Sequence, residues 1–196
     1  MKRRDFIKVA AIGTAAAAAR WDNALFAQSE EKKSTENSEK PLDIVAVHGG
    51  TAAEMFEKGI AEMGGLGRFV KKGQTVVLKP NIGWDRTPEY GANTDPELMG
   101  LVTKRCLEAG AKEVLCFDNT CGHDWENRYK VSGIKDAVEE NGGKMIPGQT
   151  ESLFEEQEIP KGVKLKKAKV HRLVTSADVF INMPILKHHS GTKITA

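Results

Sequence analysis

The stretch from Gln74 to Trp125 reads QTVVLKPNIGWDRTPEYGANTDPELMGLVTKRCLEAGAKEVLCFDNTCGHDW and decides the fold. It contains two short apolar runs, and each is followed by polar residues. The run 75–78 ends in Lys79-Pro80-Asn81, and the run 114–117 ends in Asp118-Asn119. Runs of this length and composition predict two buried strands with polar groups at their carboxyl ends.

The segment between these strands predicts a helix. Thr94 or Asp95 can cap its start, Pro96 suits its first turn, and Gly110 supplies a left-handed exit. A strand, helix, strand crossover is right-handed in nearly all sheets and makes its strands parallel neighbours. Ligands of open parallel sheets bind beyond the carboxyl ends of the strands. We therefore expect a functional site near the polar residues that follow the two strands.

The same alternation extends in both directions along the chain. Residues 43–47 predict a first strand, and a Thr51-x-x-Glu54 capping box opens a helix after a turn at Gly49-Gly50. Further on we expect a helix from Ser132 to Asn141, a strand at 144–146, a basic edge strand at 164–172 and an apolar strand at 177–184. This order predicts an α/β fold, with a mostly parallel sheet flanked by helices in a Rossmann-like three-layer arrangement.

The predicted domain covers residues 43–196, and no closing helix follows its last strand. A parallel sheet needs cover on both faces. We therefore expect the domain to be truncated at the C-terminus, and a natural end at Ala196 is the alternative.

The N-terminus predicts export. A basic start, an apolar run from Val9 to Ala19 and a small residue at Ala27 are typical of a signal peptide over residues 1–27. Arg3-Arg4-x-Phe6-Ile7-Lys8 resembles the twin-arginine signal, so we expect a periplasmic or otherwise exported protein. A chance Arg-Arg pair in a general secretory signal is the alternative. The apolar run is too short to span a bilayer, and the charged, Ser-rich residues 28–42 predict a disordered linker.

Composition excludes some partners and cofactors. The net charge of +2 includes +3 from residues 1–27, so the remainder is near −1, and nucleic acid is not an expected partner. Three cysteines without a C-x-x-C spacing cannot by themselves ligate a four-cysteine iron–sulfur cluster or form a closed zinc site. Cys106 and Cys116 fall on predicted apolar faces and are most simply small core residues.

Candidate ligand-binding groups gather where the predicted strands end. His48 follows the first predicted strand, Lys79 and Asp118 follow the next two, and Asn182 ends the last. These residues are expected at one rim because the strands are predicted to be parallel. The loop after Asp118 adds further potential metal ligands, Cys121, His123 and Asp124, although their spacing matches no specific metal motif. Alternatively, Asp118 and Asn119 make only a local turn.

Several ordered motifs resemble the domain of unknown function family 362. They are Val77-Leu78-Lys79-Pro80-Asn81, Thr94-Asp95-Pro96-Glu97-Leu98, Glu108-Ala109-Gly110-Ala111-Lys112-Glu113-Val114 with Asp118, Ala177-Asp178, and Ile181-Asn182-Met183-Pro184-Ile185-Leu186-Lys187-x-His189. By matching position, the resemblance implies polar motif residues at Lys79, Asn81, Asp118, Asn182, Lys187 and His189. It also implies a redox association, since many members carry ferredoxin-like clusters; this chain lacks the clustered cysteines for one of its own.

Two functional hypotheses follow, besides a purely structural role for these polar groups. In the first, an exported, redox-associated protein binds a small anion through Lys79, Asn81, Asn182 and Lys187, with Asp118 or His189 as acid or base. In the second, a non-catalytic periplasmic accessory protein holds a divalent metal or an anion, with ligands from Cys121, His123, Asp124, His188 and His189. The basic strand at 164–172 could dock an acidic redox partner, or could be a solvated edge whose lysines discourage aggregation.

Overall fold

The computed structural model describes residues 42–195. These residues belong to the second of two compact units of the chain, Pro41–Ala196. The predicted signal peptide at 1–27 and all but the last residue of the predicted linker lie outside the described residues.

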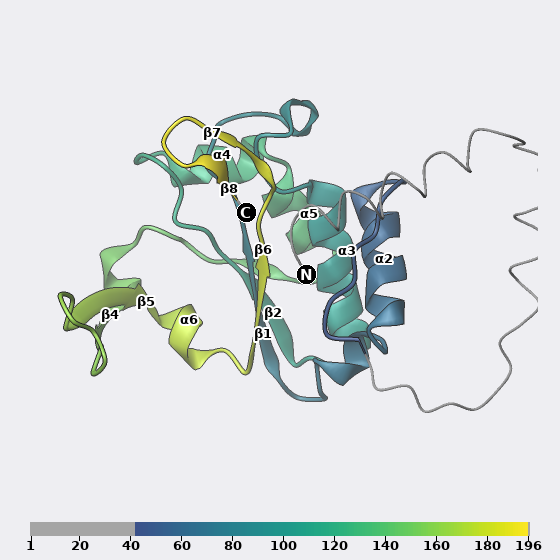
Figure 1. Ribbon diagram of the computed structural model, residues 1–196, viewed down its shortest axis with the longest axis horizontal. Helices are drawn as coiled ribbons and strands as arrows, with labels where there is room; N and C mark the ends of the chain where they lie inside the picture. The colour runs from purple at the N-terminus through teal and green to yellow at the C-terminus, as the bar shows by residue number, and fades with distance from the viewer. Residues whose placement is uncertain (1–41, 196) are drawn as a thin grey trace, which may run out of the picture. The chain divides into compact units, whose positions relative to one another are not determined.

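A four-stranded parallel sheet forms the centre of the domain (Figure 1). Its strands are β1 (Thr75–Pro80), β2 (Glu113–Cys116), β3 (Lys144–Met145) and β6 (Val179–Met183), in the order β3-β2-β1-β6. Leu78 of β1 pairs with Cys116 on one side and with Ile181 on the other. The predicted α/β fold with a parallel sheet is confirmed. The segment from Gln74 to Trp125 forms β1 and β2, with the predicted helix between them.

Helices cover one face of this sheet (Figure 1). α3 (Pro96–Glu108) and α5 (Ile134–Glu140) lie against the sheet, α2 (Ala52–Glu62) packs on the outer side of α3, and α4 (Trp125–Val131) lies beyond the carboxyl ends of the strands (Figure 1). The predicted caps form: Thr51 and Glu54 make a capping box, and the Asp95 carboxylate accepts from the backbone N–H of Leu98 at 2.9 Å. The main core lies between these helices and the sheet, and includes Val76, Leu78, Met99, Val102, Cys106, Cys116 and Val138.

The opposite face has a smaller cover. The antiparallel hairpin of β4 (Phe154–Glu158) and β5 (Lys167–His171) leads into the short helix α6 (Arg172–Ser176). Leu173 of α6 packs with Val77 and Phe117 in a second, smaller core cluster. A second hairpin, β7 (Lys187–His189) and β8 (Lys193–Thr195), follows β6, and single 3-10 turns lie at Leu66–Arg68, Pro88–Tyr90 and Glu151–Leu153.

The predicted first strand at 43–47 is wrong, because these residues form no strand in the structure. Val45 and Val47 instead line an apolar groove with Met55 and Phe56 of α2. Alternating apolar residues satisfy the pattern of a strand even when a helix, rather than a neighbouring strand, buries them. His48, which is exposed, therefore does not end a sheet strand.

The sequence patterns also missed further elements, among them β4, α4, α6, β7 and β8. Residues 149–162 read as irregular, yet they contain β4, which pairs with the predicted basic strand. Exposed ion pairs accompany this pairing: Lys167 lies 2.7 Å from Glu156 and 3.3 Å from Glu158 of β4, and Lys169 pairs with Glu151 in the turn before β4. The short helix α4 was also not predicted, because Asp124 caps it inside what reads as a polar loop.

Candidate functional site

The carboxyl ends of β1, β2 and β6 bring four of the predicted site residues to one rim. Lys79 of β1 is in direct register with Asn182 of β6. Asn81 follows β1, and Asp118 follows β2 by two residues. The parallel register therefore produces the convergence that the sequence predicted, with the exception of His48.

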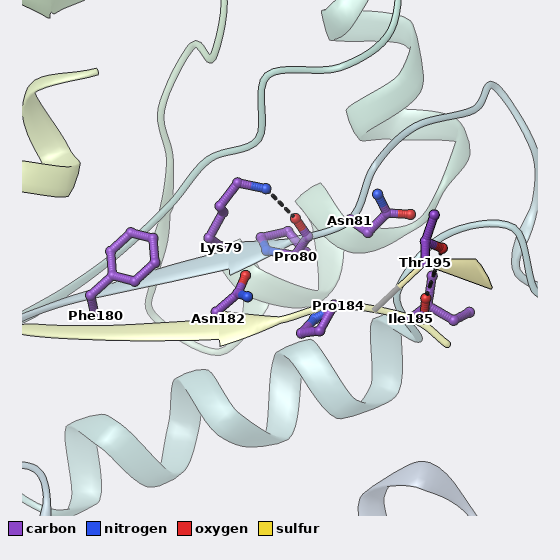
Figure 2. Close-up of a pocket in the computed structure, with 8 residues that line it drawn as sticks. All are labelled: Lys79, Pro80, Asn81, Phe180, Asn182, Pro184, Ile185 and Thr195. Atoms are coloured by element: carbon purple, nitrogen blue, oxygen red, sulfur yellow. Dashed lines mark hydrogen bonds between the residues drawn. The ribbon is translucent and has the colours of Figure 1, made fainter. Parts of the chain in front are cut away.

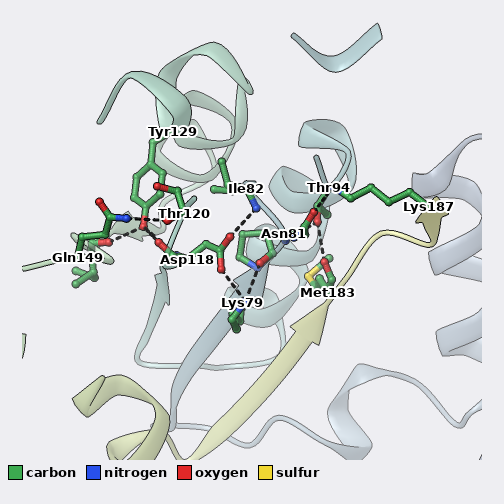
Figure 3. A network of polar contacts seen from close by, with 12 residues as sticks. Lys79, Asn81, Ile82, Thr94, Asp118, Thr120, Tyr129, Gln149, Met183 and Lys187 are labelled. Atoms are coloured by element: carbon green, nitrogen blue, oxygen red, sulfur yellow. Dashed lines mark hydrogen bonds and ion pairs between the residues drawn. The ribbon is translucent and has the colours of Figure 1, made fainter. Parts of the chain in front are cut away.

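An ion pair joins the first two strands at this rim. Lys79 Nζ lies 2.6 Å from Asp118 Oδ1, and Asp118 is only 4% exposed. The second carboxylate oxygen, Oδ2, accepts the backbone N–H of Ile82 at 2.6 Å (Figure 3). Lys79 Nζ also donates to the carbonyl of Pro80 at 3.3 Å. Both oxygens of Asp118 thus have donors within the protein, so the carboxylate fixes the turn that follows β1.

Tyr129 of α4 braces Asp118 from the side of the helices. Its hydroxyl accepts the backbone N–H of Asp118 at 2.8 Å and lies 2.6 Å from the Asp118 carbonyl oxygen. The Ile146 carbonyl is a further acceptor at 3.3 Å. Burial raises the pKa of Tyr129, so the hydroxyl keeps its proton. Sequence reasoning missed this residue because α4 was not predicted.

Lys187 and Asn81 form a second polar pair at the rim. Lys187 Nζ donates to Asn81 Oδ1 at 2.7 Å and to the carbonyl of Ala92. The backbone N–H of Asn81 donates to Thr94 Oγ1 at 2.8 Å, and this hydroxyl donates to the Met183 carbonyl at 2.7 Å. Desolvation lowers the pKa of Lys187, while the negative charges that Cys121 and Asp118 can carry partly oppose that shift. Lys187 is thus an ammonium group whose hydrogen-bond acceptors are neutral.

A cavity of about 390 Å³ opens beside these residues, between the ends of β1 and β6. Figure 2 shows Phe180 and Asn182 on β6, with Lys79 beside Asn182 on the neighbouring strand β1. The complete lining is Lys79, Pro80, Asn81, Phe180, Asn182, Pro184, Ile185 and Thr195. An ammonium group and two amides therefore share a cavity with an aromatic ring and apolar side chains. Lys187 does not line this cavity itself, but it contacts Asn81, which does.

The remaining candidates lie elsewhere or serve local structure. His189 is exposed, and its Nδ1 accepts the backbone N–H groups of Gly191 at 3.0 Å and Thr192 at 3.2 Å. Asp124 caps α4 by accepting from the Asn127 N–H at 3.3 Å. Cys121, His123 and His188 are exposed. Within residues 42–195, no three His, Cys, Asp or Glu side chains gather in a metal-binding arrangement, and the predicted metal site stays a prediction.

The other two cysteines are structural. Cys106 and Cys116 are fully buried, as predicted for small core residues. Burial raises the pKa of the Cys106 thiol to about 12 and raises that of Cys116 as well. A thiol that stays protonated at neutral pH is a poor nucleophile, and both residues lie in the hydrophobic core.

Comparison with known families shows to which family the chain belongs. The family described as Domain of unknown function (DUF362) matches residues 76–196, which is more than half of the chain. The chain belongs to the DUF362 family. The match begins in β1 and includes all of the rim residues described above, from Lys79 to Lys187.

This DUF362 chain is also similar to the thylakoid-associated protein sll1697 of Synechocystis sp.. The two are 29% identical over 139 residues, which cover 68% of this chain and 40% of the relative. The chain therefore aligns with less than half the length of that protein. No solved structure matches the chain. None of the helices in the described part is both long enough and apolar enough to cross a membrane.

Proposed function

We propose that this DUF362 chain binds a small molecule with an anionic group in the cavity between β1 and β6. The observation that carries the proposal is the shared cavity of Lys79, Asn81 and Asn182 at the carboxyl edge of a parallel sheet. Open α/β sheets bind their ligands at this edge. Export to the periplasm and a redox association, which the N-terminal residues and the family resemblance suggest, belong to the same proposal.

The polar half of the cavity suits an anion. Asn182 is exposed and its amide makes no hydrogen bond within the described residues, so both of its N–H groups are free to donate. Asn81 presents its own amide nitrogen, while its oxygen is occupied by Lys187. Lys79 shares its charge with Asp118 but is 35% exposed at its side chain. An oxyanion between these groups would gain hydrogen bonds from two amides and one ammonium group.

The apolar half of the cavity limits the chemical character of the rest of the ligand. Phe180, Pro184 and Ile185 line it, and Phe180 is 39% exposed although it is a large aromatic residue. An aromatic face at a polar cavity favours a flat or apolar ligand body. We infer a ligand with a carboxylate or phosphate at one end and a compact apolar group at the other.

Asp118 acts as a positioning residue in this proposal. Its two oxygens are committed to Lys79 and Ile82, and its backbone is held by Tyr129. Deleting this carboxylate would free Lys79 and release the turn that carries Asn81.

The test is a ligand screen on the purified protein, by thermal shift and then by calorimetry, with phosphate, simple carboxylates and aromatic carboxylates. Asn182→Asp should weaken binding of an anionic ligand by about tenfold or more, because it replaces an amide donor by a like charge. Asn127→Asp, the same substitution at an exposed residue of α4 outside the cavity, is the matched control. Equal affinities in the two variants would refute the proposed cavity.

A further inference from the structure

The loop that joins β4 to β5, residues 159–166, presents an unusual combination of side chains to solvent. It reads IPKGVKLK, with three lysines and no acidic residue. Val163 is 89% exposed and Leu165 is 59% exposed, although both side chains are aliphatic. Figure 1 shows this loop at the end of the domain opposite to α2. We call residues 159–166 the hairpin tip.

The backbone of the hairpin tip is closed by hydrogen bonds. The N–H of Ile159 donates to the Lys166 carbonyl at 2.7 Å, and the N–H of Gly162 donates to the Ile159 carbonyl at 2.9 Å. An added Cβ at Gly162 would collide with the Leu165 carbonyl oxygen, so only glycine allows the loop to fold back this tightly. The Ile159 side chain is half-buried and lies against Gly162, whereas Val163 remains outside. The exposure of the aliphatic pair is thus a property of a closed loop.

The charges of the hairpin are separated along its length. Lys167 and Lys169 of β5 form ion pairs with glutamates of β4 and of the turn before it. Lys161, Lys164 and Lys166 form no ion pair with any carboxylate within residues 42–195. The ammonium group of Lys166 donates to a neutral acceptor, the carbonyl of Gly162, at 2.6 Å. The glutamates therefore neutralise the lysines of the strand, and three uncompensated positive charges lie at the tip.

Two simpler explanations cover only part of this pattern. Lysines at the edge of a sheet discourage aggregation, but the tip forms no strand, and Val163 and Leu165 would counteract such protection. Docking of an acidic protein would use the lysines, but a stable protein interface buries about 800 Å² on each partner. A loop of this length does not supply that area. An interface with lipid needs no such area, because a few apolar side chains can enter it directly.

We propose that the hairpin tip docks on an anionic phospholipid surface. Val163 and Leu165 enter the boundary between headgroups and acyl chains, and the three lysines contact the lipid phosphates. Charge complementarity favours this partner, since each lysine near an anionic membrane strengthens binding by about fivefold. The long lysine stems keep the ammonium groups at headgroup level while their aliphatic neighbours insert. The alternation of Val163, Lys164, Leu165 and Lys166 supplies both kinds of contact from one short segment.

The test of the charges is co-sedimentation of the full chain with vesicles of equal amounts of phosphatidylglycerol and phosphatidylcholine, compared with vesicles of phosphatidylcholine alone. The tip variant replaces its three lysines by glutamine: Lys161→Gln, Lys164→Gln and Lys166→Gln. It should bind the anionic vesicles about a hundredfold more weakly. A control variant makes the same change at three exposed lysines outside the hairpin: Lys58→Gln, Lys112→Gln and Lys130→Gln. The control should bind as the original protein does.

The test of the apolar contacts uses a second pair of variants. Val163→Ser combined with Leu165→Ser should weaken binding to the anionic vesicles by about tenfold or more. Ile44→Ser combined with Leu186→Ser, at residues that are 87% and 70% exposed, is the matched control and should not change binding. All these side chains are exposed, so every variant should melt at the temperature of the original protein.

Acetylation of the unsubstituted protein reports on the hairpin tip alone, because the N-terminal residues are the same with and without vesicles. Anionic vesicles should protect the tip lysines from acetylation and leave Lys112 and Lys130 as reactive as in solution. Absence of binding to anionic vesicles would overturn the proposal, as would binding that leaves the tip lysines unprotected. Weaker binding on loss of the tip lysines but not of Val163 and Leu165 would also overturn it, because that result indicates a purely charged partner such as an acidic protein.

Discussion

Lys79 Nζ and Asp118 Oδ1 lie 2.6 Å apart although 39 residues separate them in the chain. The pair exists because β1 and β2 are parallel neighbours and both residues follow the register Leu78 to Cys116. The same carboxylate also holds the N–H of Ile82. One side chain therefore fixes both the strand end that carries Lys79 and the turn that carries Asn81.

We predict that Asp118→Asn destabilises the protein by about 2 kcal/mol, because it removes a buried charged acceptor and leaves Lys79 without its partner. The value lies below that for a fully buried pair, because the Lys79 side chain is 35% exposed. Urea unfolding of Asp118→Asn, Lys79→Met and the double variant measures the coupling between the two residues. Additive effects of the single substitutions would contradict the role assigned to the ion pair.

Tyr129→Phe should cost about 1–3 kcal/mol, because it leaves the backbone N–H and C=O of Asp118 without the hydroxyl that contacts them. The ring itself keeps its packing, including the edge-on contact with Trp125 at 5.2 Å. Denaturant unfolding measures the cost. Amide exchange at Asp118 separates this effect from a general loosening, since the prediction requires faster exchange there than in β1.

The sequence predicted the parallel sheet and most of the rim because both follow from local patterns. The apolar run before Lys79 and the capped helix that starts at Asp95 need no information about distant contacts. Parallel register then brings Lys79 and Asn182 together automatically. For the same reason, Cys106 and Cys116 were correctly expected in the core.

The failures come from contacts that no local pattern specifies. Val45 and Val47 alternate like a strand, but their burial comes from α2. The partner of Lys187 is Asn81, 106 residues away, and neither residue alone indicates the other.

We predict that the protein loses stability in mild acid because of the buried environment of His171. The residue is 3% exposed, and its ring stacks on that of Phe117 with 4.1 Å between the ring centroids. The ring nitrogen Nδ1 accepts the backbone N–H of Leu173 at 3.3 Å. The proton is therefore on Nε2, which donates to the Pro147 carbonyl at 3.2 Å. Desolvation lowers the pKa of His171 below its ordinary value of 6.5; the Pro147 carbonyl opposes this shift and Arg172 adds to it.

The unfolded chain therefore binds more protons than the folded protein between the folded pKa and 6.5. The free energy of unfolding should be highest above pH 6.5 and should fall as the pH drops through that window. Urea unfolding at a series of pH values measures the slope. His171→Phe should flatten it, whereas His123→Asn, at an exposed residue, should leave it unchanged.

Lys187 should titrate below Lys167 and Lys169 of the β4–β5 hairpin. Desolvation lowers its pKa from 10.5, whereas hydrogen bonds to Glu156 and Glu151 raise those of Lys167 and Lys169. Competitive acetylation followed by mass spectrometry should show Lys187 becoming reactive at a lower pH than Lys167. In Asn81→Ala the midpoint should fall further, because the lost acceptor stabilises the charged form. The reverse order of Lys187 and Lys167 would contradict the environment described here.

Two helical glycines should respond in opposite directions to substitution by alanine. At Gly100 of α3, an added Cβ would lie 2.8 Å from Asn141 Nδ2 and 3.1 Å from the Ala137 carbonyl oxygen of α5. That backbone oxygen cannot move aside, so Gly100→Ala should destabilise the protein by about 1–3 kcal/mol through overpacking.

At Gly59 of α2, the atom nearest to an added Cβ is Val47 Cγ2 at 3.4 Å, an ordinary contact. Gly59→Ala should therefore stabilise by about 0.4–1 kcal/mol, since alanine has fewer unfolded conformations to lose. Thermal and urea unfolding of both variants decide the point, and a destabilising Gly59→Ala would show that 45–47 packs on α2 more tightly than these distances imply.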